Sequence, residues 1–362
     1  MAKLAGLYIL DESTRASVYG PEQHRAIEQH VEWVGPAQTR ETIQEQPRLL
    51  RDVEVIFSGW TPPAFDDAFL DRSPRLRAIF YAAGAMNASA AGRRGIVVTT
   101  AHQANSKPVA EYTLATILFS LKHGWRLARE ARDHCTYKAT DRDSVPGTFG
   151  TTVGLVGMGA VSRLLLPLLK PFDLNVVAYD PALSSSEAAR LGVERVGLAE
   201  VFDRSHVVSL HAAQNPETRG LIGLKHFALM REGATFINTA RGGIVRESDL
   251  IAVAARRPDL QFILDVTDPV EPPVRESPLY TLPNVVLTPH LAGSAGGECR
   301  RLGECMVEEL RRYVRGEPLR WSVPNEQAEA ATRNAAADPN FRPSPSPRHR
   351  YQDRSFEIGV HV

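Results

Sequence analysis

The sequence predicts an α/β protein whose centre forms a doubly wound parallel sheet. Short apolar runs, rich in β-branched residues, alternate there with longer stretches of helical composition. The runs lie at 153–156, 175–179, 207–210, 234–237, 262–264 and 285–287. Continuous apolar strands at this spacing are typical of a parallel sheet that helices cover on both faces.

The N-terminal third shows a weaker version of the same alternation. Strands are predicted at 4–10, 53–57, 76–81 and 96–99, with helical pieces at 21–30 and 64–70. We therefore expect a second, smaller α/β unit in this part of the chain.

Two longer helices are predicted in addition. One covers 109–132, with Pro108 near its first turn. The other covers 297–316 and has a charged face that includes Arg300, Glu308 and Glu309. From about residue 325 the chain has almost no apolar periodicity, which predicts a mostly disordered tail over 325–362.

The composition excludes several classes of partner. The 362 residues include 42 basic and 42 acidic ones, so nothing indicates binding to nucleic acid or to an anionic membrane. Cys135, Cys299 and Cys305 share no metal-ligand spacing, and we expect reduced thiols and no metal. The apolar start is short for a signal sequence, and no apolar run approaches the ~20 residues of a membrane span. A soluble, cytoplasmic protein is expected.

A glycine-containing loop, Gly157-Met-Gly159-Ala-Val-Ser162, joins a predicted strand to a predicted helix. Glycines in such a loop let the backbone approach a pyrophosphate, which the helix N-terminus stabilises. Asp180 ends the next strand, 21 residues after Gly159 (180 − 159), where a carboxylate binds ribose hydroxyls and repels a 2′-phosphate. The pattern predicts a Rossmann-type unit that binds NAD rather than NADP.

Ser162 stands where this pattern has its third glycine. That position permits close packing of helix on strand, so we expect a slightly displaced helix and retained binding. A degenerate unit that no longer binds a nucleotide is the alternative.

Polar residues follow four strands of the predicted central sheet. They are His211 after 207–210, Arg241 after 234–238, Asp265 after 262–264 and His290 after 285–288. Because the carboxyl ends of parallel strands meet at one edge, where ligands bind, we expect these side chains to converge on one site.

In order along the chain, these motifs resemble the D-isomer-specific 2-hydroxyacid dehydrogenase family. The resemblance covers about residues 50–322. It rests on Val109–Glu111, Gly157–Ser162, Asp180, His211, Pro216–Ile222, Asn238–Gly243, Leu264–Val266, Glu271-Pro272 and Thr288–Gly293.

The resemblance implies an oxidoreductase that transfers a hydride between NAD(H) and a small 2-hydroxy acid or 2-keto acid, the D-isomer of the former. Arg241 would clamp the substrate carboxylate and polarise the 2-oxo group. His290 would give a proton to the carbonyl oxygen in reduction and remove it in oxidation, a task that suits an imidazole near neutral pH. Glu271 would orient the imidazole and favour its protonated form.

The same resemblance implies which residues contact the cofactor, with Asp265 at its nicotinamide end. They are Gly157, Gly159, Ala160, Val161, Asp180, His211, Ala212, Thr239, Ala240, Arg241, Asp265, His290 and Gly293.

The substrate-facing loop is predicted at 82–86, where Gly84 and Ala85 could offer backbone N–H groups to a carboxylate alongside Arg241. Trp60 either walls the substrate pocket or belongs to the core.

The spacing around Glu271 leaves one assignment open. In the family the acid lies five residues after the strand-ending aspartate, a position that Val270 occupies here, whereas Glu271 lies six after Asp265. A one-residue loop insertion would leave Glu271 functional. Asp268 is the competing carboxylate, because geometry decides which of the two reaches His290.

The resemblance also implies two domains. A smaller, flavodoxin-like substrate domain would comprise 1–106 with 295–324, and a Rossmann domain would comprise 107–294, with catalysis between them. The long helix 109–132 would serve as a homodimer contact.

Two alternatives remain for the function. One is an NAD-sensing, corepressor-like binding protein without enzymatic activity. The other is a formate- or phosphite-type dehydrogenase of the same fold, although the formate enzymes have a glutamine where this chain has Glu271.

Overall fold

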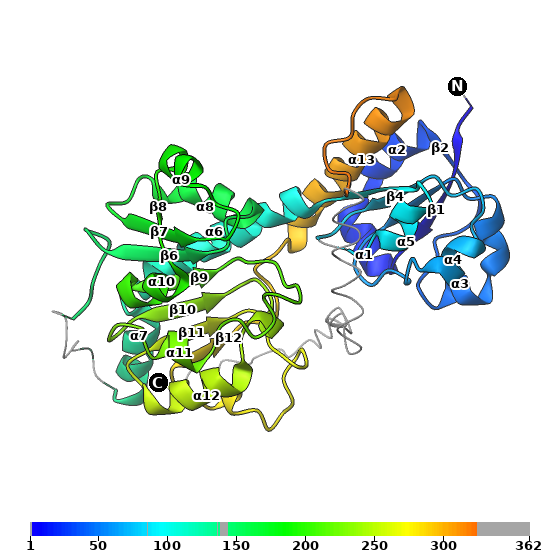
Figure 1. Ribbon diagram of the computed structural model, residues 1–362. Helices are drawn as coiled ribbons and strands as arrows, with labels where there is room; N and C mark the ends of the chain where they lie inside the picture. The colour runs from blue at the N-terminus through cyan, green and yellow to red at the C-terminus, as the bar shows by residue number, and fades with distance from the viewer. Residues whose placement is uncertain (1, 85, 136, 138–143, 324–362) are drawn as a thin grey trace, which may run out of the picture.

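The computed structural model describes residues 2–84, 86–135, 137 and 144–323. These residues form two lobes, each built around its own parallel sheet (Figure 1). Ala85 and the tail predicted over 325–362 lie outside the described residues. No helix of the described part is long and apolar enough to cross a membrane.

The smaller lobe contains a five-stranded sheet in the order β2-β1-β3-β4-β5. This is the strand order of flavodoxin-like folds, so the prediction of a second α/β unit is confirmed. Its strands are β1 (Leu4–Ile9), β2 (Val31–Trp33), β3 (Val55–Ser58), β4 (Ala78–Tyr81) and β5 (Val97–Thr100). Its helices are α1 (Glu12–Val18), α2 (Pro21–Glu28), α3 (Thr42–Glu45), α4 (Asp67–Asp71), α5 (Ser89–Arg93) and, from the far end of the chain, α13 (Cys299–Arg315).

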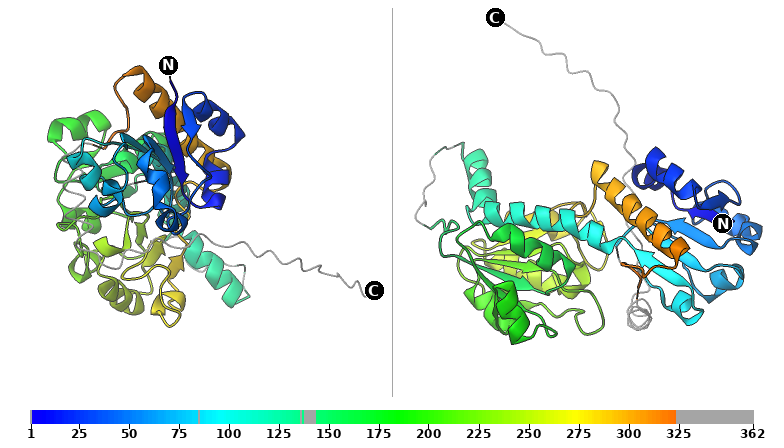
Figure 2. Two further views of the ribbon diagram at one scale, coloured as in Figure 1. Left: turned by 90° about the vertical axis from the view of Figure 1, so that its right-hand side faces the viewer. Right: turned by 90° about the horizontal axis from the view of Figure 1, so that it is seen from above.

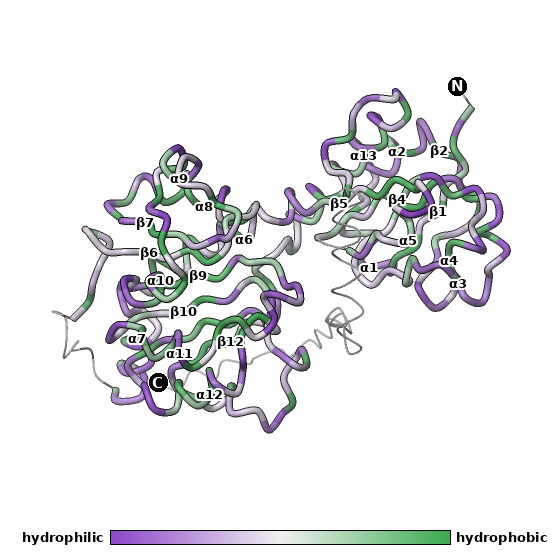
Figure 3. The backbone as a smooth tube through the Cα atoms, in the orientation of Figure 1, coloured by the Kyte–Doolittle hydropathy of each residue, from purple (hydrophilic) through white to green (hydrophobic). Residues whose placement is uncertain are grey.

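Both faces of this sheet are buried. Along β1, Tyr8 packs into the cluster that includes Leu302 of α13, whereas Leu7 and Ile9 pack into the opposite cluster with α3, α4 and α5. Successive side chains of a strand point to opposite faces, so a strand covered on both sides must be apolar throughout. Figure 3 shows the apolar strands of both lobes flanked by more hydrophilic helices and loops.

The larger lobe contains a seven-stranded parallel sheet in the order β12-β11-β10-β9-β6-β7-β8. The chain runs outward from β6 in one direction and from β9 in the other, which confirms the doubly wound, Rossmann-type prediction. Its strands are β6 (Thr152–Val156), β7 (Asn175–Tyr179), β8 (Glu194–Arg195), β9 (Val207–Leu210), β10 (Thr235–Asn238), β11 (Gln261–Leu264) and β12 (Val285–Leu287). Its helices are α6 (His102–Ser120), α7 (Gly124–Asp133), α8 (Ala160–Leu169), α9 (Ser185–Leu191), α10 (Leu198–Arg204), α11 (Leu224–Phe227) and α12 (Glu247–Arg256).

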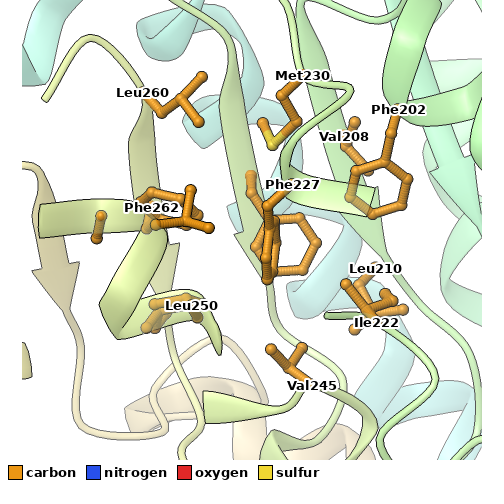
Figure 4. Packing of buried hydrophobic residues seen from close by; sticks show 14 of the residues in the cluster. Phe202, Val208, Leu210, Ile222, Phe227, Met230, Val245, Leu250, Leu260 and Phe262 are labelled. Atoms are coloured by element: carbon orange, nitrogen blue, oxygen red, sulfur yellow. The ribbon is translucent and has the colours of Figure 1, made fainter. Parts of the chain in front are cut away.

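Aromatic side chains fill one face of the larger sheet. Phe202, Phe227 and Phe262 converge there with aliphatic residues from α12 and the loops (Figure 4). Phe236 of β10 belongs to this cluster, whereas its neighbour Ile237 packs on the other face, beneath α6 and α8. Both faces are therefore sealed, and only the ends of the strands can present polar groups.

The long helix predicted over 109–132 is wrong in its extent. The structure has two helices: α6, which begins seven residues earlier and contains Pro108 in its interior, and α7, which follows a turn at 121–123. His123 adopts a left-handed conformation in that turn, with φ 50°. Gly124 lies against the ring of Phe119, where a Cβ would stand 2.4 Å from a ring carbon. The turn is thus set by local packing that a helical periodicity does not reveal. Figure 2 shows α6 running from one lobe to the other.

The predicted charged face of the last helix is also wrong at Glu309. This residue is fully buried, and its carboxylate accepts hydrogen bonds from the backbone N–H groups of Arg320 and Trp321. The segment after α13 is thereby held against β5, where Val323 donates to the carbonyl of Val98. The end of the described chain returns to the smaller lobe.

Candidate active site

The glycine loop lies between β6 and α8. Gly157 has φ +94°, and a Cβ there would stand 2.5 Å from the backbone nitrogen of Ala212, so only glycine fits this position. A Cβ at Gly159 would meet nothing within 4 Å, which leaves the start of α8 open on that side. A backbone that is free of side chains at a helix N-terminus can bind a pyrophosphate, so these residues fit a dinucleotide.

Ser162 is fully buried, and its hydroxyl donates to the carbonyl of Gly157 at 2.6 Å. The residue that replaces the third glycine thus ties α8 to the loop. Ala160 and Val161 form the first turn of this helix, as the sequence placed them.

Asp180 follows β7, which neighbours β6. Its carboxylate accepts the N–H of Met158 at 2.7 Å and the N–H of Ala182 at 2.8 Å. It therefore braces the glycine loop from the side on which the sequence predicts the ribose. Arg163, on the first turn of α8, is paired with Glu187 at 2.8 Å and donates to the carbonyl of Met158.

His211 follows β9 and is tied to β6 through a bond from its N–H to the carbonyl of Val156. Its Nε2 lies 2.9 Å from the Ser209 hydroxyl. Burial lowers the pKa of His211 to about 4, so the ring is neutral near pH 7 and does not serve as an acid there. His211 and Ala212 instead lie against Gly157 and shape the cofactor side of the site.

The Arg241 loop is braced by a buried amide. Asn238 accepts the N–H of Ala240 and donates to the carbonyl of Arg241, each at 3.0 Å. The next residue, Gly242, packs so tightly that a Cβ would stand 2.0 Å from the carbonyl oxygen of Thr267. The loop that carries Arg241 is therefore packed on the loop that leads to Glu271.

Arg241 is exposed to solvent, and its guanidinium donates to the carbonyl of Ala240 at 2.6 Å. Desolvation lowers the pKa of its guanidinium, while Glu271 and Tyr81 raise it. An arginine starts from a pKa so far above 7 that it stays charged. Tyr81 belongs to β4, so this interaction brings the smaller lobe to the site.

Asp265, which the sequence placed at the nicotinamide end, is buried. Its carboxylate accepts hydrogen bonds from the N–H groups of Leu291 and Ala292, both at 2.9 Å, and from the Thr288 hydroxyl at 2.6 Å. These three bonds fix the loop that carries His290. In this structure Asp265 is a positioning residue for that loop.

His290 has φ 51°, a left-handed conformation that a non-glycine residue adopts only when its surroundings impose it. Its N–H donates to the carbonyls of Asp265 and Thr288. Its Nδ1 lies 2.5 Å from Oε1 of Glu271. Nε2 is then the ring nitrogen available for proton transfer.

Of the two candidate carboxylates, Glu271 is the one that contacts His290. The backbone N–H of Asp268 donates to Glu247 on α12, at 2.9 Å. Burial raises the pKa of the Glu247 carboxyl, and the hydrogen bond from the N–H of Asp268 partly offsets this rise. Glu247 thus anchors the loop between Asp265 and Glu271 from behind.

Two polar residues of α6 belong to the site but were not predicted. Asn105 accepts the N–H of Ser294 at 3.0 Å and lies against Gly293, with its amide 3.9 Å from a Cβ built at Gly84. The Tyr112 hydroxyl lies 3.1 Å from that of Thr288, which in turn donates to Asp265. Single polar residues in an apolar helix gave no pattern that could have identified them.

Comparison with known proteins gives three findings. Residues 114–292 match the family model described as "D-isomer specific 2-hydroxyacid dehydrogenase, NAD binding domain". D-3-phosphoglycerate dehydrogenase from Mycobacterium tuberculosis is 34% identical over 257 residues, which is 70% of this chain and 48% of that protein. The chain thus spans about half the length of the curated relatives that it matches.

Solved structures share the fold of the whole described chain. A protein from Thermus thermophilus superposes with a TM-score of 0.71 at 27% identity, covering 88% of this chain and 100% of that one. The NAD-complexed form of a D-isomer specific 2-hydroxyacid dehydrogenase from Lactobacillus delbrueckii superposes with a TM-score of 0.70 at 18% identity, over 88% of this chain and 100% of that one. Residues 114–292 therefore form an NAD-binding domain of the kind found in D-isomer specific 2-hydroxyacid dehydrogenases.

Proposed function

We propose that this protein is an NAD-dependent dehydrogenase that interconverts a small D-2-hydroxy acid and its 2-keto acid. Bound at the glycine loop, the cofactor supplies or accepts the hydride. The protein supplies a cation for the carboxylate and a proton for the oxygen.

Arg241 binds the carboxylate and polarises the 2-oxo group. Its planar fork of N–H donors matches a carboxylate with two parallel hydrogen bonds, which an ammonium group cannot copy. Asn238 and Gly242 fix the backbone of the Arg241 loop, and the guanidinium donates to the carbonyl of Ala240 at 2.6 Å. Because the loop is fixed before substrate arrives, little ordering of its backbone is required on binding.

His290 transfers the proton. In reduction, Nε2 gives its proton to the oxygen that becomes the hydroxyl, and in oxidation it takes that proton back. Glu271 holds Nδ1 and compensates the charge of the imidazolium.

The observation that carries this proposal is the contact between Glu271 and His290, next to Arg241, at the strand ends of an NAD-binding domain. The lobes would then correspond to a substrate domain (1–106 with 295–324) and an NAD domain (107–294).

The test is the loss of NADH absorbance with a panel of 2-keto acids: glyoxylate, pyruvate, hydroxypyruvate, phenylpyruvate and branched-chain acids. We expect turnover with at least one of them and none without a keto acid. NADH affinity is measured in parallel by calorimetry. Tight NADH binding without turnover of any acid would favour the corepressor-like alternative.

We also propose a cytoplasmic homodimer that associates through α6 and α7. Support comes from α7, which has no buried residue in the single chain, and from Phe119 of α6, whose surface is 43% exposed. Light scattering on the purified protein should give twice the mass of one chain.

A further inference from the structure

The carboxyl edge of the smaller sheet reaches the site at Gly84, where a Cβ would stand 3.9 Å from the amide nitrogen of Asn105. This edge carries no basic side chain that could bind a second anion. The segments that follow β1, β3, β4 and β5 are 10–11, 59–63, 82–84 and 101–102. None contains lysine or arginine. Burial lowers the pKa of His102, so its imidazole is neutral near pH 7.

The charge that this edge does carry is negative. Asp11 follows β1, and its Oδ2 accepts the Thr61 hydroxyl at 2.7 Å. Thr61 itself has φ 58°, so the turn after β3 is held in an uncommon conformation beside this carboxylate. An anion that approaches this edge meets a fixed negative charge.

Two aromatic side chains make up much of the remaining edge. Tyr81 ends β4, is 7% exposed, and interacts electrostatically with Arg241. Burial raises its pKa to about 12, so it is an uncharged phenol at neutral pH. Trp60 is partly buried and packs against the cluster beneath α13.

Two arginines of the adjoining helices lie against groups of the smaller lobe. Arg15 on α1 is paired with Glu12 at 2.7 Å. The guanidinium of Arg300 lies against Gly20, in the turn between α1 and α2. Among the described residues that come directly after the strands of the two sheets, Arg241 is the permanent cation.

Resting on the proposed function, we propose that the site takes monoanionic 2-keto acids with an uncharged side chain. Arg241 is satisfied by the single carboxylate. A phosphate or second carboxylate would lie near Asp11 and an aromatic surface, where a desolvated charge without a partner is costly. The name D-3-phosphoglycerate dehydrogenase, which several relatives have, refers to a phosphorylated substrate. This chain would therefore differ from those relatives in the class of its substrate.

A matched pair of substrates tests the proposal directly. Hydroxypyruvate and 3-phosphohydroxypyruvate differ only in the phosphate, and pyruvate and oxaloacetate differ in a second carboxylate. We expect kcat/KM for the monoanionic member of each pair to exceed that of its partner by at least about tenfold, the discrimination of one unpaired charge.

Two variants locate the discrimination. Asp11→Asn removes the negative charge and should narrow the hydroxypyruvate to 3-phosphohydroxypyruvate ratio by roughly three- to tenfold. Trp60→Lys adds a cation at the same edge and should reduce the hydroxypyruvate to 3-phosphohydroxypyruvate ratio further. Asp52→Asn is the control: it removes an exposed carboxylate before β3, at the opposite edge of the same sheet, and should leave the ratio unchanged.

The outcomes separate the two proposals. Equal or better use of 3-phosphohydroxypyruvate by the wild-type protein overturns the substrate class and leaves the dehydrogenase function intact. If Asp11→Asn and Asp52→Asn change the hydroxypyruvate to 3-phosphohydroxypyruvate ratio of kcat/KM equally, Asp11 does not contribute to the discrimination. If no keto acid of either class is reduced, the proposed function fails and the substrate class fails with it.

Discussion

The two sheets follow one plan but end differently. Both are all-parallel and covered by helices on both faces, so polar groups are confined to their edges. The carboxyl edge of the larger sheet carries Asp180, His211, Arg241, Asp265 and His290. That of the smaller sheet carries small, aromatic and acidic residues. The comparison suggests a division of labour in which one lobe performs the chemistry and the other selects the substrate.

The loops of the two edges are also held by different means. In the larger lobe, buried polar side chains fix the backbone: Asn238 holds the Arg241 loop and Asp265 holds the His290 loop. In the smaller lobe, Ala82 and Ala83 are buried and are held by bonds between backbone groups, such as that from the N–H of Ala82 to the carbonyl of Ser58. Support from buried side chains places the donors and acceptors of a loop to within a narrow range, as catalysis requires, whereas an apolar wall needs only shape.

The largest effect should come from removing the proton donor of the larger lobe. His290→Gln is expected to lower kcat by ~10²–10⁴-fold, the usual contribution of a positioned acid–base group, with NADH affinity little changed. The measurement is steady-state reduction of the best keto acid, with NADH binding followed by calorimetry. The exposed His134 gives the control His134→Gln, which should behave as wild type. If His290→Gln kept full activity, His290 would not be the proton donor and the catalytic site would not lie at this edge of the larger sheet.

A smaller loss of activity is expected when the positive charge at position 241 is kept but the planar guanidinium is removed. Arg241→Lys should lower kcat/KM for the keto acid by roughly 10–100-fold, because one ammonium cannot make both hydrogen bonds to the carboxylate. Arg256→Lys, at the exposed end of α12, is the control. If Arg241→Lys raises KM for NADH as much as KM for the keto acid, Arg241 serves the cofactor rather than the substrate.

Substitution of Asp180 should change the preference for NADH over NADPH, measured as the ratio of their kcat/KM values, by about tenfold. Wild-type kcat/KM with NADH should exceed that with NADPH, because the Asp180 carboxylate repels a 2′-phosphate. Asp180→Ala should weaken NADH binding and narrow the gap. Since this carboxylate also accepts the N–H groups of Met158 and Ala182, Asp180→Asn separates the loss of charge from the loss of the brace. Equal wild-type efficiency with both cofactors would contradict the assignment.

The strands of the larger lobe, and the polar residues that follow them, could be predicted from the sequence because these polar residues stand out against apolar strands. A histidine or arginine directly after a buried strand has few structural explanations, and convergence of several leaves fewer still. Tyr81 was missed for the opposite reason: a tyrosine that ends an apolar strand looks like a core residue, and its electrostatic interaction with Arg241 depends on the fold.

Features that depend on distant partners were beyond sequence reasoning. Glu309 looked like part of a solvated face, and its burial depends on residues 320–321, which return to it. The turn between α6 and α7 depends on how Phe119 packs on Gly124. The family resemblance implied that Asp265 contacts the cofactor, whereas its bonds to the His290 loop follow from the path of that loop.

The smallest expected effect is a shift in pH dependence, and it tests how the larger lobe tunes its acid. Reduction needs protonated His290, which the Glu271 carboxylate stabilises through the contact at Nδ1. Activity in reduction therefore falls as pH rises and the proton is lost. Glu271→Gln removes the charge that contacts the ring, so this fall should move to lower pH. Oxidation needs the neutral ring, so its rise should move in the same direction. Asp268→Asn is the matched control on the same loop, where the structure shows its backbone bound to Glu247, and should leave both profiles in place. The measurement is kcat/KM against pH in both directions. A shift in Asp268→Asn but not in Glu271→Gln would make Asp268 the partner of His290 in solution, and no shift in either would mean that His290 works without a carboxylate.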